Sequence, residues 1–263
     1  MISSSWNIFM PEKTVSVIIP ARNEEALISR VLDAVLRAAG NPSHLSETDT
    51  EVIVVDNASA DDTLGIVRQY AARYGVQWIQ CQQVRAPCAR NRGAKSARGR
   101  VFVFVDADTV IPPHTLNRVR HLCDAGGYQA GITWYASLEG GGRAWCWWTF
   151  WSLIRCLPIP RTKAMPALMF CTRAAFHEFG PFDERVAIGE EWPILAGLYG
   201  ARSHRFIYDR TITALTSSRR MELQPFGYLR TFLRYLWAVA HVSGRLDYRD
   251  HCRHVLSQQE HVL

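Results

Sequence analysis

The chain has 263 residues, of which 48% are hydrophobic and 21% charged, and its formal net charge at pH 7 is +6. This composition excludes a disordered or fibrous protein, and the length suits one large globular domain because no linker, low-complexity run or internal repeat divides it. The longest uncharged apolar stretches, residues 144–154 and 235–244, are about half of the roughly 20 residues that a membrane-spanning helix needs.

Apolar strands and helical segments alternate over the first 110 or so residues. The pattern predicts strands at residues 15–20, 51–55, 76–81 and 101–105. It predicts helices between them, which begin at Asn23 as a cap, at Asp61 or Asp62, and at Pro87, and which end near Gly40, Gly75 and Gly99. This alternation favours right-handed βαβ units and therefore a parallel sheet.

The pattern becomes less regular after residue 112. Weaker strands are expected near residues 131–138 and 167–171, and helices near residues 173–179, 190–198 and 226–242. A Gly-Gly-Gly break at residues 140–142 precedes an aromatic-rich segment. We expect this half of the chain to build the second side of a cleft.

Two carboxylates, Asp106 and Asp108, follow the fourth predicted strand, whose five residues are all apolar. In open α/β sheets ligands bind at the carboxyl ends of the strands, and paired carboxylates there suit a divalent cation that bridges to phosphate oxygens. The alternative is a polar turn, because Asp and Thr are favoured in turns and at helix N-termini.

The turn after the first strand, residues 20–25, contains no glycine, although a dinucleotide-binding fold would carry Gly-x-Gly-x-x-Gly there. A Walker loop is also missing from the sequence. Any bound pyrophosphate must therefore be neutralised by a cation and by basic side chains. Residues 85–100 hold six basic and no acidic residues, and residues 201–263 hold ten arginines against five acidic residues.

Five motifs follow one another between residue 15 and about residue 220. They are Val17-Ile-Ile-Pro-Ala-Arg-Asn-Glu-Glu25, Val54-Val-Asp-Asn-Ala-Ser59, Ala89-Arg-Asn-Arg-Gly93, Val105-Asp-Ala-Asp-Thr109, and Gly180-Pro-Phe-Asp-Glu184 followed by Gly189-Glu-Glu-Trp192. Their order and spacing resemble the family-two glycosyltransferases of the GT-A fold. The resemblance implies an α/β fold with a Rossmann-like, mostly parallel sheet, helices on both faces and an irregular acceptor-side C-terminal half.

The resemblance also implies a role for each matched residue near the donor. The residues that would line the nucleotide pocket or lie near the nucleotide are Pro20, Ala21, Arg22, Glu24, Arg90, Asn91, Gly93, Lys95, Asp106, Ala107 and Asp108, with Arg90 or Lys95 facing phosphate. Asp108 would bind Mg²⁺ or Mn²⁺ directly, and Asp106 would contact the ribose or a metal-bound water. Asp56 would accept a hydrogen bond from the base, and the alternative for Asp56 is a capping role. For any single basic residue in this set, the alternative is a solvated position on the surface.

An acceptor hydroxyl needs a base to take its proton. In the family a Glu-Asp pair at a helix start supplies it, whereas this chain has Glu190 and Glu191. The resemblance implies Glu191 as the base and Glu190 as the second choice. The alternative is a first helical turn in which two acids interact with the helix dipole. The Gln-x-x-Arg-Trp signature of processive synthases is absent, so a single sugar addition is expected.

We expect one domain over residues 1–263, with a nucleotide-binding half at 1–110, an acceptor-side half at 111–225 and a basic amphipathic helical region at 226–263. The aromatic residues after the glycine break suit sugar faces, a lipid interface or core packing; they are Trp145, Trp147, Trp148, Phe150 and Trp151. Arg230, Arg234 and His241 share one helical stripe, which is typical of an interfacial helix or of a core helix with one wet edge. Residues 217–220 resemble a Thr/Ser-x-Arg-Arg element that often follows the acidic pair in this family, and they suit either a phosphate contact or a surface turn.

These features together predict a metal-dependent transferase that moves one sugar from a UDP- or GDP-sugar to an acceptor hydroxyl. The resemblance implies inversion, although a retaining mechanism stays open, and a lipid-linked or cell-envelope acceptor. Seven cysteines without a Cys-x-x-Cys pair suit a reducing cytoplasm, with membrane-surface contact at the inner face. The alternatives are a nucleotidyltransferase and a non-catalytic protein that binds phosphate or nucleic acid; we expect no nucleic-acid partner.

Overall fold

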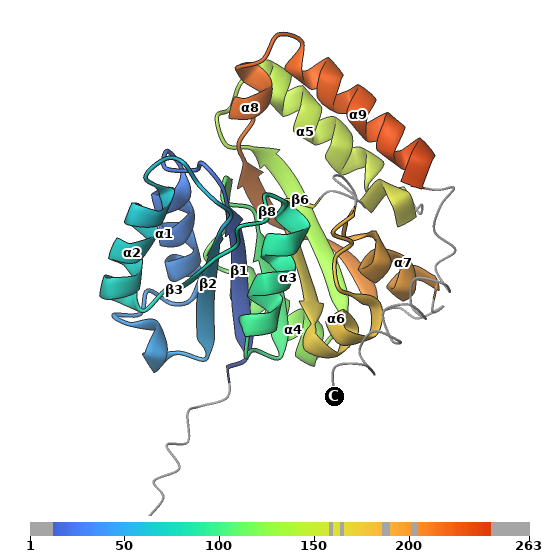
Figure 1. The fold of residues 1–263 in the computed structure, drawn as a ribbon. Helices are drawn as coiled ribbons and strands as arrows, with labels where there is room; N and C mark the ends of the chain where they lie inside the picture. Colours follow the sequence, from blue (N-terminus) through green and yellow to red (C-terminus); the bar gives the residue numbers. More distant parts are fainter. Residues whose placement is uncertain (1–12, 158–159, 164–165, 186–189, 201–204, 243–263) are drawn as a thin grey trace, which may run out of the picture.

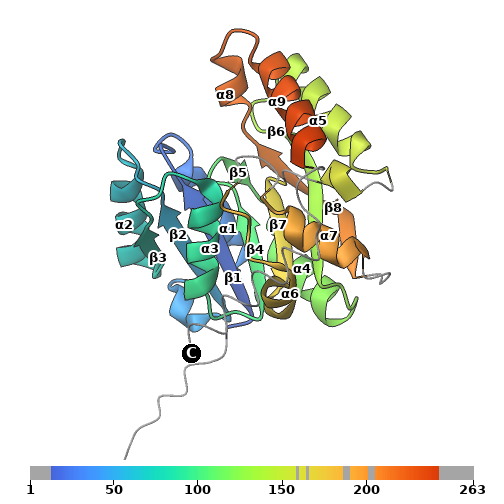
Figure 2. The ribbon, with the colours of Figure 1, turned by 45° about the vertical axis from the view of Figure 1, so that its right-hand side comes forward.

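The computed structural model describes residues 13–242 apart from 158–159, 164–165, 186–189 and 201–204 (Figure 1). Within these residues eight strands form one sheet in the order β3-β2-β1-β4-β7-β6-β8-β5. Helices cover both faces of this sheet, as predicted (Figures 1 and 2). The fold is therefore α/β, with a mixed sheet in which most neighbouring strands are parallel.

The N-terminal half has the predicted alternation of strands and helices. Its strands are β1 (Val15–Ala21), β2 (Thr50–Asp56), β3 (Gln77–Gln80) and β4 (Val101–Val105), and all their pairings with one another are parallel. Its helices are α1 (Ile28–Ala38), the short η1 (Leu45–Glu47), α2 (Thr63–Tyr74) and α3 (Ala86–Ser96). Because β1 pairs parallel with both β2 and β4, the carboxyl ends of these three strands lie at the same edge of the sheet.

One predicted helix start is wrong. Helix α1 begins at Ile28, five residues beyond Asn23, and no side chain caps it. Asn23 instead adopts a left-handed φ of 54° in the turn after β1, and its Oδ1 accepts a hydrogen bond from the backbone N of Ala60 at 2.8 Å. Asn23 therefore ties this turn to the turn after β2, because the amide finds a better backbone partner there than at a helix N-terminus.

The C-terminal half adds antiparallel strands and further helices. Its strands are β5 (Thr109–Val110), β6 (Ala130–Ser137), β7 (Leu168–Thr172) and β8 (Phe206–Thr216), of which β7 pairs antiparallel with β4 and β6, and β8 pairs parallel with β6. Its helices are α4 (Thr115–Asp124), α5 (Gly142–Ile154), η2 (Pro160–Lys163), α6 (Arg173–Phe179), α7 (Trp192–Gly200), α8 (Arg219–Glu222) and α9 (Gly227–Val242). The predicted β6, β7, α6, α7 and α9 are confirmed within a few residues.

Two apolar layers enclose the sheet. Helices α1, α2 and α4 pack on one face through residues such as Val35, Val67 and Leu116. Helices α3, α6 and α7 pack on the other through residues such as Ala89 and Phe176. Because both faces are covered, every residue of β2 and β4 is buried, which explains why these strands read as continuous apolar runs rather than as alternating ones.

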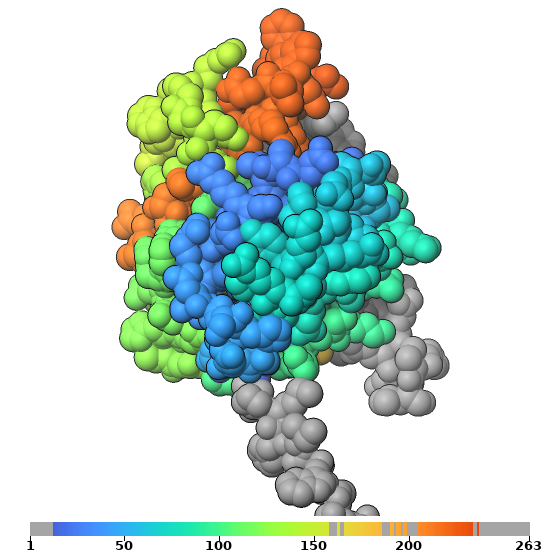
Figure 3. Space-filling view, turned by 90° about the vertical axis from the view of Figure 1, so that its left-hand side faces the viewer, coloured from blue at the N-terminus to red at the C-terminus, as the bar shows by residue number. Residues whose placement is uncertain are grey.

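Helices α5, α8 and α9 form a separate projection, called here the helical lobe (residues 142–157 and 219–242). In Figures 1 and 2 the three helices lie side by side beyond the end of the sheet, and in the space-filling view they rise above the N-terminal half (Figure 3). Trp151 of α5 packs against Phe232 of α9 with ring centroids 6.0 Å apart. Among the described residues no helix has both the length and the apolar character to cross a bilayer.

Candidate active site

Two adjoining cavities lie where the carboxyl ends of β1 and β4 approach the helical lobe. The first has a volume of about 310 Å³ and the second about 490 Å³. Both are lined by Ala86, Arg90, Asp106, Asp108 and Arg220, so these five residues form the junction between the two spaces. The junction includes both carboxylates that the sequence places after the fourth strand.

The first cavity contains eight of the residues predicted to lie near a nucleotide. They are Pro20, Ala21, Arg22, Glu24, Arg90, Asp106, Ala107 and Asp108. Four come from the end of β1 and the turn after it, and three from the turn after β4. They converge because β1 and β4 are neighbours in parallel register, with Val15 beside Val101, so both chains turn away from the sheet at the same edge.

The other four residues predicted for the nucleotide site lie outside both cavity linings. Asp56 is buried, and its carboxylate accepts a hydrogen bond from the backbone N of Ser59 at 3.3 Å, as a capping aspartate does. Gly93 lets α3 approach β1, since a Cβ there would meet Ile18 Cγ2 at 2.4 Å. Lys95 is exposed on α3.

The fourth of these residues, Asn91, joins α3 to the motif at residues 180–184. Its Nδ2 donates to the backbone O of Phe182 at 2.9 Å, and the backbone N of Phe182 donates to its Oδ1 at 2.9 Å. The next residue of the motif, Asp183, donates its backbone N to the backbone O of Glu190 at 2.9 Å. Asn91 and this motif therefore fix where the acidic pair begins.

Asn57 lines the first cavity, although the sequence reasoning chose its neighbour Asp56. The Asn57 side chain is buried, and its Oδ1 has no hydrogen-bond partner among the described residues. A buried acceptor without a partner carries a free-energy cost unless a ligand or water satisfies it. The signal that could have found Asn57 is its place in the motif at residues 54–59, one position beyond the end of β2.

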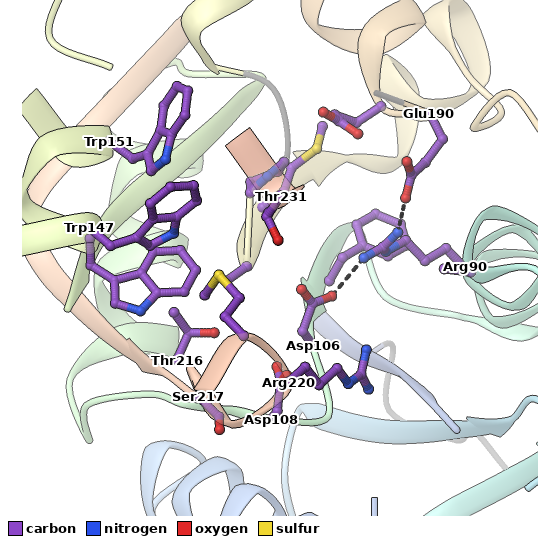
Figure 4. A pocket seen from close by; sticks show the side chains of 18 of the residues that line it. Arg90, Asp106, Asp108, Trp147, Trp151, Glu190, Thr216, Ser217, Arg220 and Thr231 are labelled. Carbon is purple, nitrogen blue, oxygen red and sulfur yellow. Dashed lines mark hydrogen bonds and ion pairs between the residues drawn. The ribbon is translucent and has the colours of Figure 1, made fainter. Parts of the chain in front are cut away.

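Arg90 holds two carboxylates at the junction of the cavities. Its Nη2 lies 2.6 Å from Asp106 Oδ1, and its Nη1 forms an ion pair with Glu190 (Figure 4). Burial alone lowers the pKa of Arg90, but the charges of Asp106 and Glu190 outweigh it and raise that pKa. Arg90 therefore stays charged, and it links α3, the end of β4 and the start of α7.

Asp108 lies in the most negative part of the junction. Burial raises the pKa of Asp108 to about 7, the charges of Asp106 and Glu24 act in the same direction, and Arg220 opposes them. Glu24 is 1% exposed and forms ion pairs with Arg220 and with Arg219, whose Nη2 lies 2.7 Å from Glu24 Oε2. The residues at 217–220 thus supply positive charge beside Asp108, a role that the sequence left open between phosphate contact and surface turn.

The carboxylates at the junction fit a divalent cation that is coordinated partly by the protein and partly by a bound ligand. Asp106 and Asp108 offer carboxylate oxygens, which Mg²⁺ and Mn²⁺ prefer. The negative charges of Asp106 and Glu24 add to burial in raising the pKa of Asp108, and a cation would offset that repulsion. Within the described residues no three His, Cys, Asp or Glu side chains gather closely enough to hold a metal by themselves. The remaining ligands of such a cation would have to be water and phosphate oxygens.

The second cavity has an acidic side and an aromatic side. Glu190 and Glu191 line it near the start of α7, and both are buried. Trp147 and Trp151 of α5 stand on the opposite side (Figure 4). Trp148 also lines this side and donates its Nε1 to Ser218 Oγ at 2.8 Å. A flat apolar wall facing carboxylates can hold a sugar ring against groups that take up protons.

A model of the family described as Glycosyl transferase family 2 matches residues 16–185. Validoxylamine A glucosyltransferase of Streptomyces hygroscopicus subsp. limoneus is 32% identical over 107 residues, which are 40% of this chain and 22% of that protein. The chain thus spans only about a fifth of the length of this curated relative.

Two solved structures share the fold. The crystal structure of S. aureus TarS 1–349 in complex with UDP-GlcNAc has a TM-score of 0.59 and 21% identity, over 93% of this chain and 71% of that one. Glucosyl-3-phosphoglycerate synthase of Mycobacterium tuberculosis, in complex with Mn²⁺, UDP-glucose and phosphoglyceric acid, has a TM-score of 0.58 and 22% identity, over 87% and 78%. At such identities these likenesses establish the fold, which is the predicted GT-A fold.

Proposed function

The chain belongs to glycosyl transferase family 2, and we propose that it transfers one sugar from a UDP- or GDP-sugar to a hydroxyl of a lipid-linked or cell-envelope acceptor, with inversion. In this proposal the N-terminal half holds the donor and the C-terminal half the acceptor. The enzyme works in the cytoplasm, at the inner face of the membrane. Membership of this family favours transfer of a sugar over the nucleotidyltransferase and non-catalytic alternatives.

The observation that carries the proposal is the junction of the two cavities. A sugar transferase must present the bond between sugar and diphosphate to an acceptor on the other side, so the two binding spaces have to meet at the reacting atoms. Here they meet at Asp106, Asp108, Arg90 and Arg220. The first cavity would hold the nucleotide and the second the acceptor, with the sugar between them.

The first cavity suits a nucleoside diphosphate. Asn57 Oδ1 can accept a hydrogen bond from an N–H group of the base, which both uracil and guanine possess. Arg220 lies beside Asp108 and can turn from Glu24 toward a diphosphate that brings more negative charge. A divalent cation held by Asp106 and Asp108 would stabilise the charge that develops on the departing diphosphate.

The second cavity suits deprotonation of the acceptor. Glu190 is engaged by Arg90, so its carboxylate holds that guanidinium in place. Glu191 lines the same cavity one residue nearer α7 and accepts hydrogen bonds on its backbone O from Ile194 and Leu195, which fixes it at the helix start. We therefore assign the base to Glu191 and a positioning role to Glu190.

A thermal-shift panel of UDP and GDP, each with and without Mn²⁺, tests the donor assignment. One of the two with Mn²⁺ should raise the melting temperature by several degrees, because ligand at about a hundredfold over Kd adds about 2.7 kcal/mol. Without Mn²⁺, neither nucleotide should raise the melting temperature as much. A panel in which no nucleoside diphosphate responds to Mn²⁺ would contradict the proposal.

Two variants at the acidic pair test the base assignment. Glu191→Gln should lower sugar transfer by at least about a hundredfold while leaving the nucleotide shift unchanged, because general bases contribute roughly 10²–10⁴ in rate. Glu190→Gln, the matched control, should weaken nucleotide binding as well, because Arg90 loses one of its two carboxylates. If both variants keep wild-type turnover, the base lies elsewhere.

A further inference from the structure

Exposed apolar side chains are concentrated on the helical lobe. Of the eleven large hydrophobic residues that are exposed in the described part of the chain, nine belong to residues 145–157 and 223–236. They are Trp145, Phe150, Leu153, Leu157, Leu223, Phe226, Leu229, Leu233 and Leu236. The other two, Trp78 and Val84, stand singly. A patch of this kind on one projection marks a contact surface, whereas scattered exposed residues need no explanation.

Helix α5 presents different apolar residues on its two sides. Trp147 and Trp151 point to the second cavity and to α9. Phe150 and Leu153 are three residues apart and exposed, so they share the outward side of the helix. Leu157, in the turn that follows the helix, is also exposed. The wall of the second cavity and the outward surface therefore belong to the same helix.

Helix α9 repeats this arrangement. Phe232 packs on Trp151, which turns that side of the helix toward α5. Leu229 and Leu233 are each more than half exposed on the other side, with Phe226 preceding them at the helix start. The two helices thus show apolar stripes to the surroundings while their packed sides are already filled by each other.

The charge on these segments is of one sign. Residues 142–157 and 223–242 contain no acidic residue. The one acidic residue in the described part of the lobe, Glu222 of α8, is paired with Arg143 at 3.5 Å, and Arg143 is still 83% exposed at the start of α5. Arg230 is exposed between Leu229 and Leu233. Tryptophan, leucine and arginine without acids are the composition of helices that lie in a membrane interface, where the arginines meet lipid phosphates.

A second copy of this chain is a poor partner for the same surface. In a symmetric dimer each residue meets the same surface of its partner, so Arg230 would face a surface whose one described carboxylate, Glu222, is already paired with Arg143. An anionic bilayer has the opposite charge and an apolar interior. Helix α9 has 16 residues and is thus about 24 Å long, shorter than the hydrocarbon core of about 30 Å, so it suits lying in the interface rather than crossing it.

We propose that the helical lobe docks on the surface of a bilayer that contains anionic lipids, and that the exposed stripes of α5 and α9 enter its interface. Because α5 also walls the second cavity, docking brings that cavity to the membrane surface. This last step rests on the proposed function, and it deepens that proposal: the acceptor is an amphiphile whose apolar part stays in the bilayer while its hydroxyl enters beside Trp147.

Flotation of the full chain with vesicles tests the docking surface. Vesicles of phosphatidylcholine with about 30% phosphatidylglycerol should carry the protein to the top of a gradient, and pure phosphatidylcholine should carry less. The double variant Leu229→Ser/Leu233→Ser should lower the vesicle partition coefficient at least about tenfold, because each leucine loses interfacial burial. Trp78→Ser, which removes an exposed apolar residue on β3, should bind as the wild type does.

Arg230→Glu should reduce binding to the anionic vesicles and abolish their advantage over neutral ones. Equal binding by wild type and the leucine variant would overturn the proposal. So would a wild-type dimer without vesicles that the leucine substitutions dissociate, since a second copy would then cover the surface. Both variants should keep the Mn²⁺-dependent nucleotide shift, so loss of docking and failure of the proposed sugar transfer give different results.

Discussion

At the scale of single residues, the junction of the two cavities brings together carboxylates that repel one another. Asp108 lies near Asp106 and Glu24, whose charges raise its pKa, and Arg220 acts against them. Asp106 and Glu24 have their own arginine partners, Arg90 and Arg219. Such an arrangement is costly in an empty protein and favourable once a cation arrives. The residue that we propose as a metal ligand should therefore also lower the stability of the metal-free fold.

Asp108→Asn should separate these two effects. A carboxyl whose folded pKa is raised to about 7 binds more protons in the folded than in the unfolded state, so its contribution to stability falls as pH rises from about 4 through 7. Asparagine does not titrate, so the variant should not lose this stability as the pH rises. Without metal, the variant should melt several degrees above wild type at pH 8 and at the same temperature as wild type near pH 4.

The same variant should show no Mn²⁺-dependent part of the nucleotide shift. Melting curves at both pH values, with EDTA and with Mn²⁺, provide the measurement. An Asn variant that still responds to Mn²⁺ would remove Asp108 from the ligand set.

Asn57 offers a second prediction at this scale. Asn57→Ala should weaken nucleoside diphosphate binding by about threefold to tenfold, the range of one neutral hydrogen bond. Lys95→Ala, the matched control on exposed α3, should leave the affinity unchanged because Lys95 lines neither cavity. Isothermal titration with the preferred nucleotide decides this, and an equal loss in both variants would count against Asn57 as a ligand.

At the scale of elements, α3 serves the site through close packing on the sheet. Gly93 allows that contact, since a Cβ would meet Ile18 at 2.4 Å and Val55 at 3.1 Å. Gly93 therefore acts on Arg90 and Asn91 indirectly, by setting the distance of their helix from β1 and β2. This packing role accounts for glycine at position 93, and the expected place of Gly93 near the nucleotide stays a prediction.

Gly93→Ala should lower stability by about 1–3 kcal/mol, as overpacking does, and the melting temperature by several degrees. Nucleotide affinity should fall with it, because Arg90 moves with the helix. Gly141→Ala is the control: a Cβ there meets nothing within 4 Å. If the Gly93→Ala variant melts at the same temperature as the wild type, then Ile18 and Val55 can move enough to accommodate the added Cβ.

The N-terminal elements were predictable because strands buried on both faces have a sequence pattern that few other structures share.

Helix α5 was missed because it is apolar nearly all round, so it has no helical period, and its tryptophans serve both the cavity and the outward surface. Strand β8 was missed because three residues bulge between Asp209 and Thr213 and interrupt its alternation. The pairing of Glu24 with Arg219 spans 195 positions, and no local pattern indicates it.

At the scale of the whole molecule, ion pairs and hydrogen bonds hold the two halves around the site. Arg90 joins α3 to the start of α7, and Glu24 joins the turn after β1 to α8. The second link also ties the lobe to the rest of the molecule, together with the hydrogen bonds between Ser152 of α5 and Tyr135 of β6. If the proposed donor diphosphate attracts Arg220, it would weaken the ion pair with Glu24, so we expect donor binding to affect the position of the lobe.

Glu24→Gln should loosen the helical lobe without unfolding the sheet, because Arg219 and Arg220 lose the charge that anchors α8. Hydrogen–deuterium exchange should become faster in residues 219–236 and stay unchanged in β1 and β4. The control Asp33→Asn also removes one negative charge, at a carboxylate of α1 that accepts a hydrogen bond from the Tyr70 hydroxyl of α2, and it should leave the lobe as in wild type. Unchanged exchange in the lobe of the Glu24 variant would rule out this anchoring.

The tryptophans of α5 also allow ligand and membrane binding to be followed by intrinsic fluorescence. Trp145 is 61% exposed and Trp151 only 7%, so their indoles sample water and a dry pocket within two turns of one helix. Light emitted by Trp145 should shift to shorter wavelength when a bilayer covers it, whereas a sugar stacked on Trp147 should change emission from the inner side. Quenchers dissolved in water and quenchers attached to lipid tails can therefore tell which side of α5 has gained a neighbour, with no dye attached.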